Sequence, residues 1–379
     1  MSQNIEIVSL TREPRDVMRF LKVAYRIYDG DPHWVAPLLS DLKKVFTDAN
    51  PLFEHAEMRL WIARHNGQDV GRIAGVLDHH HNRDRARSEH AAFWGFFESM
   101  DNPAVAKALF EAATGWARDH QVPRLLGPMN PTSNDECGLL VDGFNGRPVF
   151  MMPHNPRYYA ALAEGYGFTK AKDLLAYYID LAKIPMDRLT RIGEKVMKRN
   201  PGLRLVRVSK KTLDADLAKI KQVYNAAWED NWGFVPMTDA ELNFMAERLR
   251  PLFMEGLVWL AEEKGETVAF LLAMPDYNVA IQPMRGRLLS PGLFTALPYF
   301  LGWKCPKLSR VITLGVKRSH RGRGLETAML IEGLKTGARA GFTEAEASWI
   351  LEDNTMMCRM LEAIHGEVYR RYRIYEKAV

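Results

Sequence analysis

A short basic segment rich in glycine is the first part of the sequence whose residue types could do chemistry. Gly322 and Gly324 are separated by one residue, and residues 325–340, which favour a helix, follow directly. Glycine allows a tight turn that brings backbone N–H groups against a ligand, and a helix start carries partial positive charge. Five side chains that can be cationic lie within seven positions here: Lys317, Arg318, His320, Arg321 and Arg323. The pattern predicts a phosphate site, and the alternative is a solvated basic turn before an ordinary helix.

Two predicted strands lead to the residues of interest. The segment Arg310–Val316 favours a strand, and the basic turn connects it to the helix at 325–340. A later strand ends near Ser348–Asn354, and Thr355–Ile364 then favours a shorter helix. An alternation of strands and helices that starts from a hairpin indicates a mixed sheet of the α/β or α+β class.

The same order of elements occurs twice, because the sequence repeats itself at an offset of 198 to 200 residues. Both copies begin with a short strand and a hairpin around a polar turn containing glycine. We therefore predict two domains, residues 1–183 and 184–379, each of ordinary domain size. Four colinear similarities support the repeat: Ile5–Val8 with Leu203–Val206, Pro51–Phe53 with Pro251–Phe253, Trp61–Val70 with Trp259–Val268, and the spacing from Asn155 to Gly167 with that from Asn354 to Gly366.

The turn at 321–325, placed between a strand and a helix, resembles the acyl-CoA pyrophosphate loop of the GCN5-related N-acetyltransferase (GNAT) superfamily. Ser348–Asn354 resembles the second characteristic segment of that family, near the thioester. The resemblance extends over both copies and implies two tandem GNAT-like domains, with acetyl-CoA or another acyl-CoA bound between two splayed strands. Arg321 and Gly324 match the family's loop pattern, whereas Glu326 stands where glycine or alanine is usual.

The first copy lacks such a loop. Its corresponding stretch, Phe97–Pro103, contains no glycine and two carboxylates, and Asp101 or Asn102 before Pro103 is typical of ordinary helix capping. We therefore expect a degenerate N-terminal domain and a single acyl-CoA site in residues 184–379. The resemblance assigns the cofactor contacts to these residues: Leu314, Val316, Arg321, Gly322, Arg323, Gly324, Leu325 and Asn354.

The resemblance also implies attack of an amine on an acyl thioester, which requires a base for the amine and an acid for the leaving thiolate. In many relatives a tyrosine seven residues after the asparagine that corresponds to Asn354 acts as the general acid, and this chain has Leu361 there. Tyr369 is our candidate for the acid, although alternation along a final strand also explains Tyr369, Tyr372 and Tyr375. Glu352 is the candidate base, next to Asp353; the alternative is that Asp353 or Asn354 caps the helix that begins at Thr355.

The acceptor side is predicted in the first copy. A polar insertion there carries Asn134, Asp135 and Glu136, and loops of this kind often hold function. Tyr158 and Tyr159 could line the same pocket, but paired tyrosines at a helix start are commonly packing residues. The expected acceptor is the amine of a small molecule or peptide.

Composition excludes several other classes of protein. The 379 residues are 47% hydrophobic with a formal net charge of +5, as in a globular chain, and no apolar run is long enough to span a membrane. Cations are not concentrated in a long block, so we expect no nucleic acid. Cys137, Cys305 and Cys358 are isolated, and consecutive histidines at 79–81 cannot converge on one ion, so we expect no metal and a cytoplasmic location.

One apolar insertion, Pro291–Trp303, has three interpretations: packing between the domains, contact with a membrane, or a lid over a long acyl chain. The leading prediction is an N-acyltransferase of the GNAT type, and the sequence does not predict its oligomeric state. Two alternatives are a catalytically silent CoA-binding protein, suggested by Glu326 and Leu361, and an aminoacyl transferase on the doubled fold.

Overall fold

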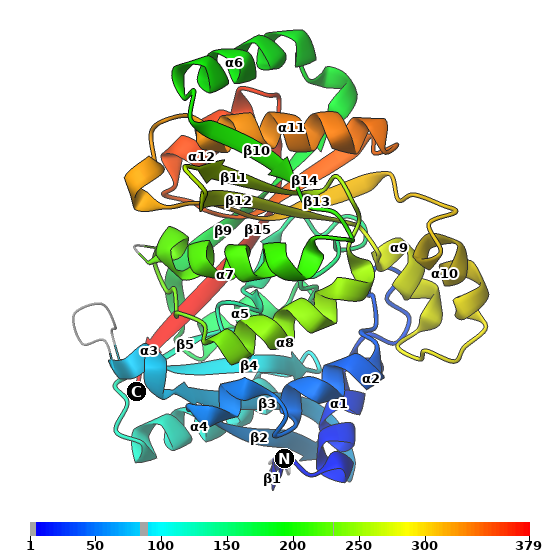
Figure 1. The fold of residues 1–379 in the computed structure, drawn as a ribbon. Helices are drawn as coiled ribbons and strands as arrows, with labels where there is room; N and C mark the ends of the chain where they lie inside the picture. The colour runs from blue at the N-terminus through cyan, green and yellow to red at the C-terminus, as the bar shows by residue number, and fades with distance from the viewer. Residues whose placement is uncertain (1–4, 84–89, 230) are drawn as a thin grey trace. The chain divides into compact units, whose positions relative to one another are not determined.

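The structure is a computed structural model that describes residues 5–83, 90–229 and 231–379. The chain forms two compact units with mixed α/β architecture (Figure 1). Each unit is discontinuous in sequence, so neither coincides with the predicted ranges 1–183 and 184–379. Unit 1 comprises Met1–Leu174, Ala280–Ala296 and Arg370–Val379, and unit 2 comprises Leu175–Val279 and Leu297–Tyr369.

Unit 1 is built on an antiparallel sheet in which β1 to β4 are neighbours in sequence order. Strand β5 pairs in parallel with β4, and the end of the chain's last strand, β15, pairs antiparallel with β5 and β8. Its elements are β1 (Ile5–Leu10), α1 (Pro14–Ile27), α2 (Leu39–Leu42), β2 (Ala56–His65), β3 (Gln68–Asp78), α3 (His79–Arg83), β4 (Ala92–Ser99), α4 (Pro103–Asp119), β5 (Arg124–Gly127), β6 (Met129–Asn130), β7 (Glu136–Cys137), β8 (Leu139–Asp142), α5 (Tyr159–Gly165) and the first half of β9 (Thr169–Asp180).

Unit 2 repeats this plan. Strands β10 to β13 are antiparallel neighbours, β14 pairs in parallel with β13, and β9 is the next strand beside β14. Its elements are α6 (Met186–Arg199), β10 (Leu203–Arg207), α7 (Leu213–Trp228), α8 (Asp239–Leu249), β11 (Val258–Glu263), β12 (Glu266–Pro275), β13 (Leu308–Val316), α11 (Leu325–Arg339), β14 (Glu344–Leu351), α12 (Thr355–Glu362) and the start of β15 (Glu367–Ala378). Helices α9 (Asn278–Ile281) and α10 (Gly292–Phe300) follow β12 in the chain, and both are divided between the units, because residues 280–296 belong to unit 1.

Local sequence explains the elements that the repeat predicted. Both hairpins turn at residues with positive φ: Asn66 and Gly67 at 51° and 78°, and Lys264 and Gly265 at 52° and 84°. Such pairs form the turns that match the twist of a two-residue hairpin. Helix α4 begins as predicted, because the Asn102 side chain accepts a hydrogen bond from the N–H of Ala104 at 2.9 Å.

Alternation along β12 divides the core of unit 2 between two helices. Ala269, Leu271 and Ala273 lie in the cluster that contains α11, whereas Phe270 lies in the cluster that contains α7. Figure 1 shows α11 on one side of these strands and α7 on the other. This sandwich supports β13 and α11, between which the glycine-rich turn lies.

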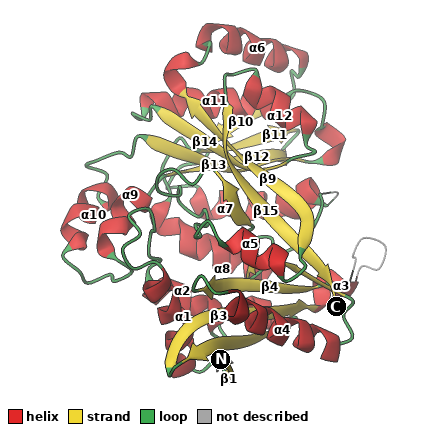
Figure 2. Cartoon of the chain, turned by 180° about the vertical axis from the view of Figure 1, so that it is seen from behind, coloured by secondary structure: helices red, strands yellow, loops and turns green. Residues whose placement is uncertain are grey.

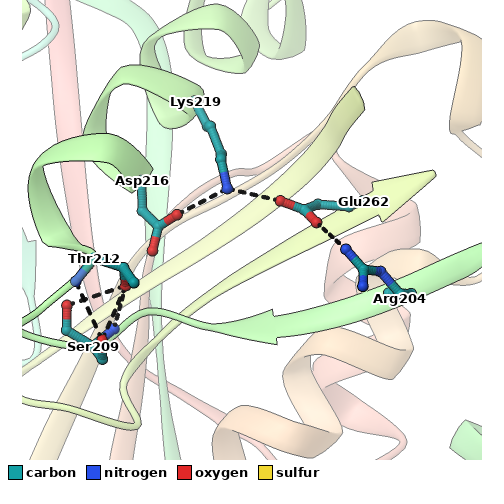
Figure 3. A network of polar contacts seen from close by, with 6 residues as sticks. All are labelled: Arg204, Ser209, Thr212, Asp216, Lys219 and Glu262. Carbon is teal, nitrogen blue, oxygen red and sulfur yellow. Dashed lines mark hydrogen bonds and ion pairs between the residues drawn. The ribbon is translucent and has the colours of Figure 1, made fainter. Parts of the chain in front are cut away.

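A polar network ties α7 to the edge of the same sheet (Figure 3). The ammonium of Lys219 donates to Asp216 at 3.0 Å and to Glu262 at 2.9 Å, and Arg204 donates to the second oxygen of Glu262 at 3.0 Å. Hydrogen bonds from Lys219 hold the pKa of Glu262 below its usual value. The network fixes the outer strands β10 and β11 against α7.

The three cysteines are free thiols. Among the described residues, no helix combines the length and the apolarity that crossing a bilayer demands.

Candidate functional site

The site in unit 2 starts from a bulge in β13. The register between β12 and β13 changes from Leu272 opposite Thr313 to Ala273 opposite Val311, so Ile312 is an extra residue. Parallel pairing of β13 with β14 ends at the same point, with Val311 opposite Ala347, although both strands continue (Figure 2). The last residues of β13, including the predicted contacts Leu314 and Val316, therefore have no β14 partner among the described pairings.

The turn after β13 leaves the start of α11 available to a ligand. Gly322 and Gly324 have φ of 74° and 82°, a conformation that favours glycine. Gly324 is the residue before the helix and supplies no capping side chain. The first N–H groups of a helix have no acceptor within it, and the helix dipole makes this end attractive to anions. Leu325 is buried and fixes the helix in the core.

Close packing under the turn makes Gly324 hard to replace. A Cβ atom at Gly324 would approach the Cγ2 atom of Val196, on α6, to 2.9 Å, whereas a Cβ at Gly322 would meet nothing within 4 Å. Gly324 thus combines a φ that would be strained for any residue with a side chain and a close contact with Val196, and α6 helps to set the position of the turn.

The cationic side chains of the turn are engaged by the protein itself. The guanidinium of Arg323 donates to both carboxylate oxygens of Glu263, at 2.6 and 3.1 Å, and to Asn200 at 2.8 Å. Glu263 has a second partner in His320, whose ring nitrogen Nε2 lies 3.0 Å from its carboxylate oxygen Oε2. Hydrogen bonds from Arg323 and His320 lower the pKa of Glu263 to about 2. Arg321 donates to the carbonyl oxygen of Ala227 at 2.8 Å. What the turn offers freely to an anion is therefore its backbone, while direct contacts from Arg321 and Arg323 stay predictions.

A buried polar network lies where β13 and β14 still pair. Arg310 is 2% exposed and donates through Nε to the Ser348 hydroxyl at 2.9 Å. That hydroxyl donates to Glu346 at 2.6 Å, and the Tyr369 hydroxyl donates to the other oxygen of Glu346. Glu346 is fully buried, and its side chain lies 3.7 Å from Arg310 Nε. In a hydrogen-bonded pair of this kind the carboxylate can accept a proton and the phenol can donate one. Acyl transfer from a thioester to an amine requires both transfers.

Sequence reasoning selected Tyr369 and missed its partner. Glu346 is flanked by Ala345 and Ala347 on a buried strand, and a carboxylate in such a strand is a rare arrangement that could have indicated it. Tyr372 and Tyr375, the other tyrosines of the last strand, are buried in unit 1. Of the three tyrosines, Tyr369 is the one that unit 2 contains.

Between β14 and α12, residues 352–353 form a turn and Asn354 caps the helix. The Asn354 side chain accepts from the N–H of Met357 at 3.2 Å and thereby caps α12, which confirms the capping interpretation for Asn354. Glu352 lies in the turn before it and is half-buried. Leu361, at the family's usual acid position, is part of the core. A base role for Glu352 and a cofactor contact from Asn354 stay predictions.

A further tyrosine near α12 gave no signal in the sequence. Tyr177, in the half of β9 that belongs to unit 2, is 2% exposed, and its hydroxyl donates to Glu362 at 3.4 Å. Burial is the main cause that raises the pKa of Tyr177, and a hydrogen bond with Cys358 is the second. The residue that meets α12 thus comes from about 180 positions earlier in the chain, a proximity that local pattern does not encode.

Unit 1 has the same bulge, but its strand is covered. Pairing of β3 with β4 changes register between Arg72 and Ala74, and β4 pairs with β5 only at Ala92 and Phe93. The Asn130 side chain accepts from the N–H of Phe96 at 2.6 Å. A Cβ atom at Gly95 would lie 1.7 Å from the carbonyl oxygen of Met129. The segment that follows β5 therefore lies directly against β4.

The residues predicted for the acceptor side all lie in unit 1. Asp135 accepts from the Thr132 hydroxyl at 3.0 Å, the N–H of Asn134 donates to the same hydroxyl oxygen at 3.2 Å, and Glu136 pairs with Asn130 in the β6–β7 hairpin. These contacts order the insertion, and contact with an acceptor stays a prediction.

Tyr158 and Tyr159 close the end of β4. The Tyr158 hydroxyl donates to the carbonyl oxygen of Ser99 at 2.8 Å, and the Tyr159 hydroxyl donates to Glu98 at 2.7 Å while accepting from the N–H of Ser99 at 2.9 Å. Burial raises the pKa of Glu98. Tyr159 is fully buried, so its hydroxyl serves the core of unit 1 at the position where unit 2 has the turn.

Comparison with known proteins agrees with this geometry. The model of the Acetyltransferase (GNAT) family matches residues 217–366. A protein of Caulobacter vibrioides (strain NA1000 / CB15N) named bacterial ceramide synthase is 34% identical over 376 residues, which cover 97% of this chain and 96% of that protein. The chain belongs to the GNAT superfamily. Protein YghO of Escherichia coli (strain K12) is 32% identical over 369 residues, 96% of this chain and 93% of that protein.

A solved structure shows the same doubled fold. A tandem GNAT protein from the clavulanic acid biosynthesis pathway superposes with a TM-score of 0.57 at 14% identity, covering 99% of this chain and 98% of that one. The tandem GNAT fold is thus confirmed, and the chain is an N-acyltransferase. GNAT enzymes use acyl-CoA as co-substrate, and the uncapped start of α11 beside the free end of β13 fits the diphosphate and amide groups of such a molecule.

Proposed function

We propose that this enzyme transfers a fatty acyl group from acyl-CoA to the amino group of a long-chain amino alcohol of the sphingoid type. The observation that carries acyl transfer is the hydrogen bond between the buried Glu346 and the half-buried Tyr369, in the same unit as the uncapped helix start. The acceptor class is supported by the full-length relative named ceramide synthase, because a ceramide is the amide of a fatty acid and a sphingoid base. This proposal narrows the expected small-molecule amine to a lipid amine.

Backbone groups would hold the acyl-CoA. The N–H groups of Gly322, Gly324 and Leu325 would bind its diphosphate, with the helix dipole adding attraction for the charge. The end of β13, at Leu314 and Val316, would bind the pantetheine amides in the manner of a strand, since β14 does not pair there. In the first turn of α11, Glu326 is half-buried, and its backbone N–H can serve while its carboxylate turns to water.

Glu346 and Tyr369 would move the protons. The amine nitrogen attacks the thioester carbon, the C–N bond forms, and the C–S bond breaks. Glu346 is fully buried, so the proton would move through the Tyr369 hydroxyl: its oxygen accepts the proton that the nitrogen loses while it passes its own proton to Glu346. The reverse transfer, from Glu346 through Tyr369, would deliver a proton to the departing thiolate and restore both groups. The products are an amide and free CoA thiol, and Ser348 holds Glu346 in place.

The test is a matrix of donors and acceptors. Acetyl-CoA and palmitoyl-CoA are each combined with sphinganine, a short alkylamine and a lysine peptide, and both CoA thiol release and the amide product are measured. We expect the highest kcat/KM for palmitoyl-CoA with sphinganine. Turnover confined to acetyl-CoA and a short amine or peptide would contradict the acceptor class. Binding of CoA without turnover of any pair would favour the silent binding protein instead.

A further inference from the structure

Residues 288–303 carry a group of solvent-exposed apolar side chains. Of the nine large apolar side chains that are strongly exposed among the described residues, seven lie between residues 288 and 303. Leu289 is 88% exposed, Phe294 82% and Trp303 75%. Large apolar groups gathered in this way mark an interaction surface, because isolated ones would be scattered over the molecule.

Helical spacing places several of these side chains together. Phe294 and Leu297 are three positions apart on α10 and lie along one side of the helix. Leu301 follows directly after the end of α10, where its N–H donates to the carbonyl oxygen of Leu297 at 2.9 Å. Ala296 is fully buried, which shows that the opposite side of α10 packs against the protein. The exposed side therefore belongs to an anchored helix.

The chain that leads into α10 is held firmly to the rest of unit 1. The N–H of Leu39 donates to the carbonyl oxygen of Gly286 at 3.0 Å, and the Gln282 amide donates to that of Pro32 at 2.8 Å. A Cβ atom at Gly292 would lie 2.1 Å from the carbonyl oxygen of Pro283, so the turn before α10 is tightly packed. Leu288 and Leu289 are thus presented by a fixed turn.

A basic hollow adjoins this turn within unit 1. It has a volume of about 830 Å³, and its wall includes Tyr25 and Ser290. Ser290 directly follows the exposed residues Leu288 and Leu289 in the sequence. The described residues that line it include no carboxylate. Four cationic side chains do line it, two from α1 and two from the turn: Lys22, Arg26, Arg285 and Arg287. A concave surface with this charge attracts phosphate-bearing groups.

We propose that the exposed apolar side chains of unit 1, Leu288, Leu289 and Phe294, form with the basic hollow a docking surface for an anionic phospholipid bilayer. Apolar side chains on an interfacial helix enter the boundary between headgroups and acyl chains, and neighbouring cations bind the anionic headgroups. The complementarity of charge selects a lipid surface over an uncharged apolar partner. This inference is independent of the proposed acyl transfer, since it uses none of the residues of that site.

Co-sedimentation of the full chain with vesicles tests the proposal. We expect binding to vesicles of phosphatidylcholine mixed with phosphatidylglycerol, weak binding to phosphatidylcholine alone, and loss of binding as salt increases. Arg285→Gln with Arg287→Gln removes two cations and should weaken binding roughly 25-fold, at about 1 kcal/mol for each. Phe294→Asp should weaken it at least as much, by placing a charge in the apolar boundary.

Matched variants control for general effects. Arg188→Gln with Arg191→Gln removes two exposed cations from α6, and Met356→Asp changes a 58% exposed apolar residue on α12; both should bind vesicles as the unaltered chain does. Equal binding to neutral and anionic vesicles, unaffected by the arginine changes, would overturn the proposal. Failure to bind either vesicle, together with self-association that Phe294→Asp abolishes, would identify the surface as a contact between copies instead.

Discussion

The strands β4 and β13 are equivalents in the two halves of a doubled fold, and they are used differently. Both carry a bulge, and both stop pairing with their parallel neighbour near it. In unit 1 the freed part of the strand is covered by Met129 and Asn130, and its end is closed by Tyr159. In unit 2 the corresponding strand leads to a glycine turn and an uncapped helix. The bulged sheet therefore supplies a place for a ligand, and the segments around it decide whether one can bind.

The largest effect should come from the proton-transfer pair of unit 2. We expect Tyr369→Phe to lower kcat roughly 100-fold or more, the usual contribution of a general acid, with CoA affinity unchanged. Steady-state kinetics and calorimetric titration with CoA measure the two quantities. Tyr178→Phe is the matched control, because its ring lies 6.0 Å from that of Tyr369. Equal losses in both variants would remove Tyr369 from the mechanism.

Glu346→Gln should lower kcat similarly, but Arg310 would then lack its buried charged neighbour, and the protein should also be less stable by about 3 kcal/mol or more. Thermal unfolding of this variant separates the loss of stability from the loss of activity. A stable Glu346→Gln enzyme with normal kcat would contradict the proposed base.

The glycine turn provides the next effect. We expect Gly324→Glu to weaken CoA binding at least roughly tenfold, because φ is 82° and the Cβ position meets Val196. Gly265→Glu controls for the strain, since Gly265 has φ of 84° in a hairpin turn where a Cβ meets nothing within 4 Å. Calorimetry should give one CoA per chain for the control. Two sites per chain would show that unit 1 binds as well.

The covering segment of unit 1 should affect stability without affecting CoA binding. In Asn130→Ala the N–H of Phe96 loses its acceptor, which should reduce the free energy of unfolding by about 1–3 kcal/mol. Denaturant unfolding measures this change, and titration should show unaltered CoA affinity. A new CoA site in this variant would mean that the segment alone keeps unit 1 from binding.

The smallest effect should come from Glu263, which holds Arg323 and His320. Glu263→Gln removes the carboxylate that neutralises the Arg323 guanidinium, so CoA affinity should rise about two- to threefold and depend more strongly on salt. The pKa of Glu263 is lowered to about 2, so its ion pair with Arg323 persists from neutral pH down through the usual pKa of a glutamate and is lost only as the pH falls toward 2. CoA titrations at two salt concentrations test the release, and unchanged affinity at both would contradict it.

Local signals in the sequence predicted much of the fold. Asn66–Gly67 and Lys264–Gly265 encode their hairpins through backbone preference, and the repeat of these turns predicted the doubled architecture. Asn102 and Pro103 encode the start of α4 in the same local way. The glycine turn was likewise predicted at 321–325.

The polar network of the site depended on contacts distant in the chain. Glu346 acquires meaning from Arg310 and Tyr369, which come from two other strands, and Tyr177 reaches α12 from the end of the first copy. Periodicity assigns such residues to a buried strand but does not tell which polar groups meet. Residues 280–296 likewise pack in unit 1 through contacts with residues that are distant in the chain, which local sequence patterns do not predict.

The course of the last strand has a consequence for how this protein is made. Arg370–Val379 belong to unit 1, where Arg370 donates to the carbonyl oxygens of Gly143, Asn145, Gly146 and Arg147. No single cut of the polypeptide would release either half intact. On the ribosome, the sheet of unit 1 is completed only after residues 370–379 have been synthesised.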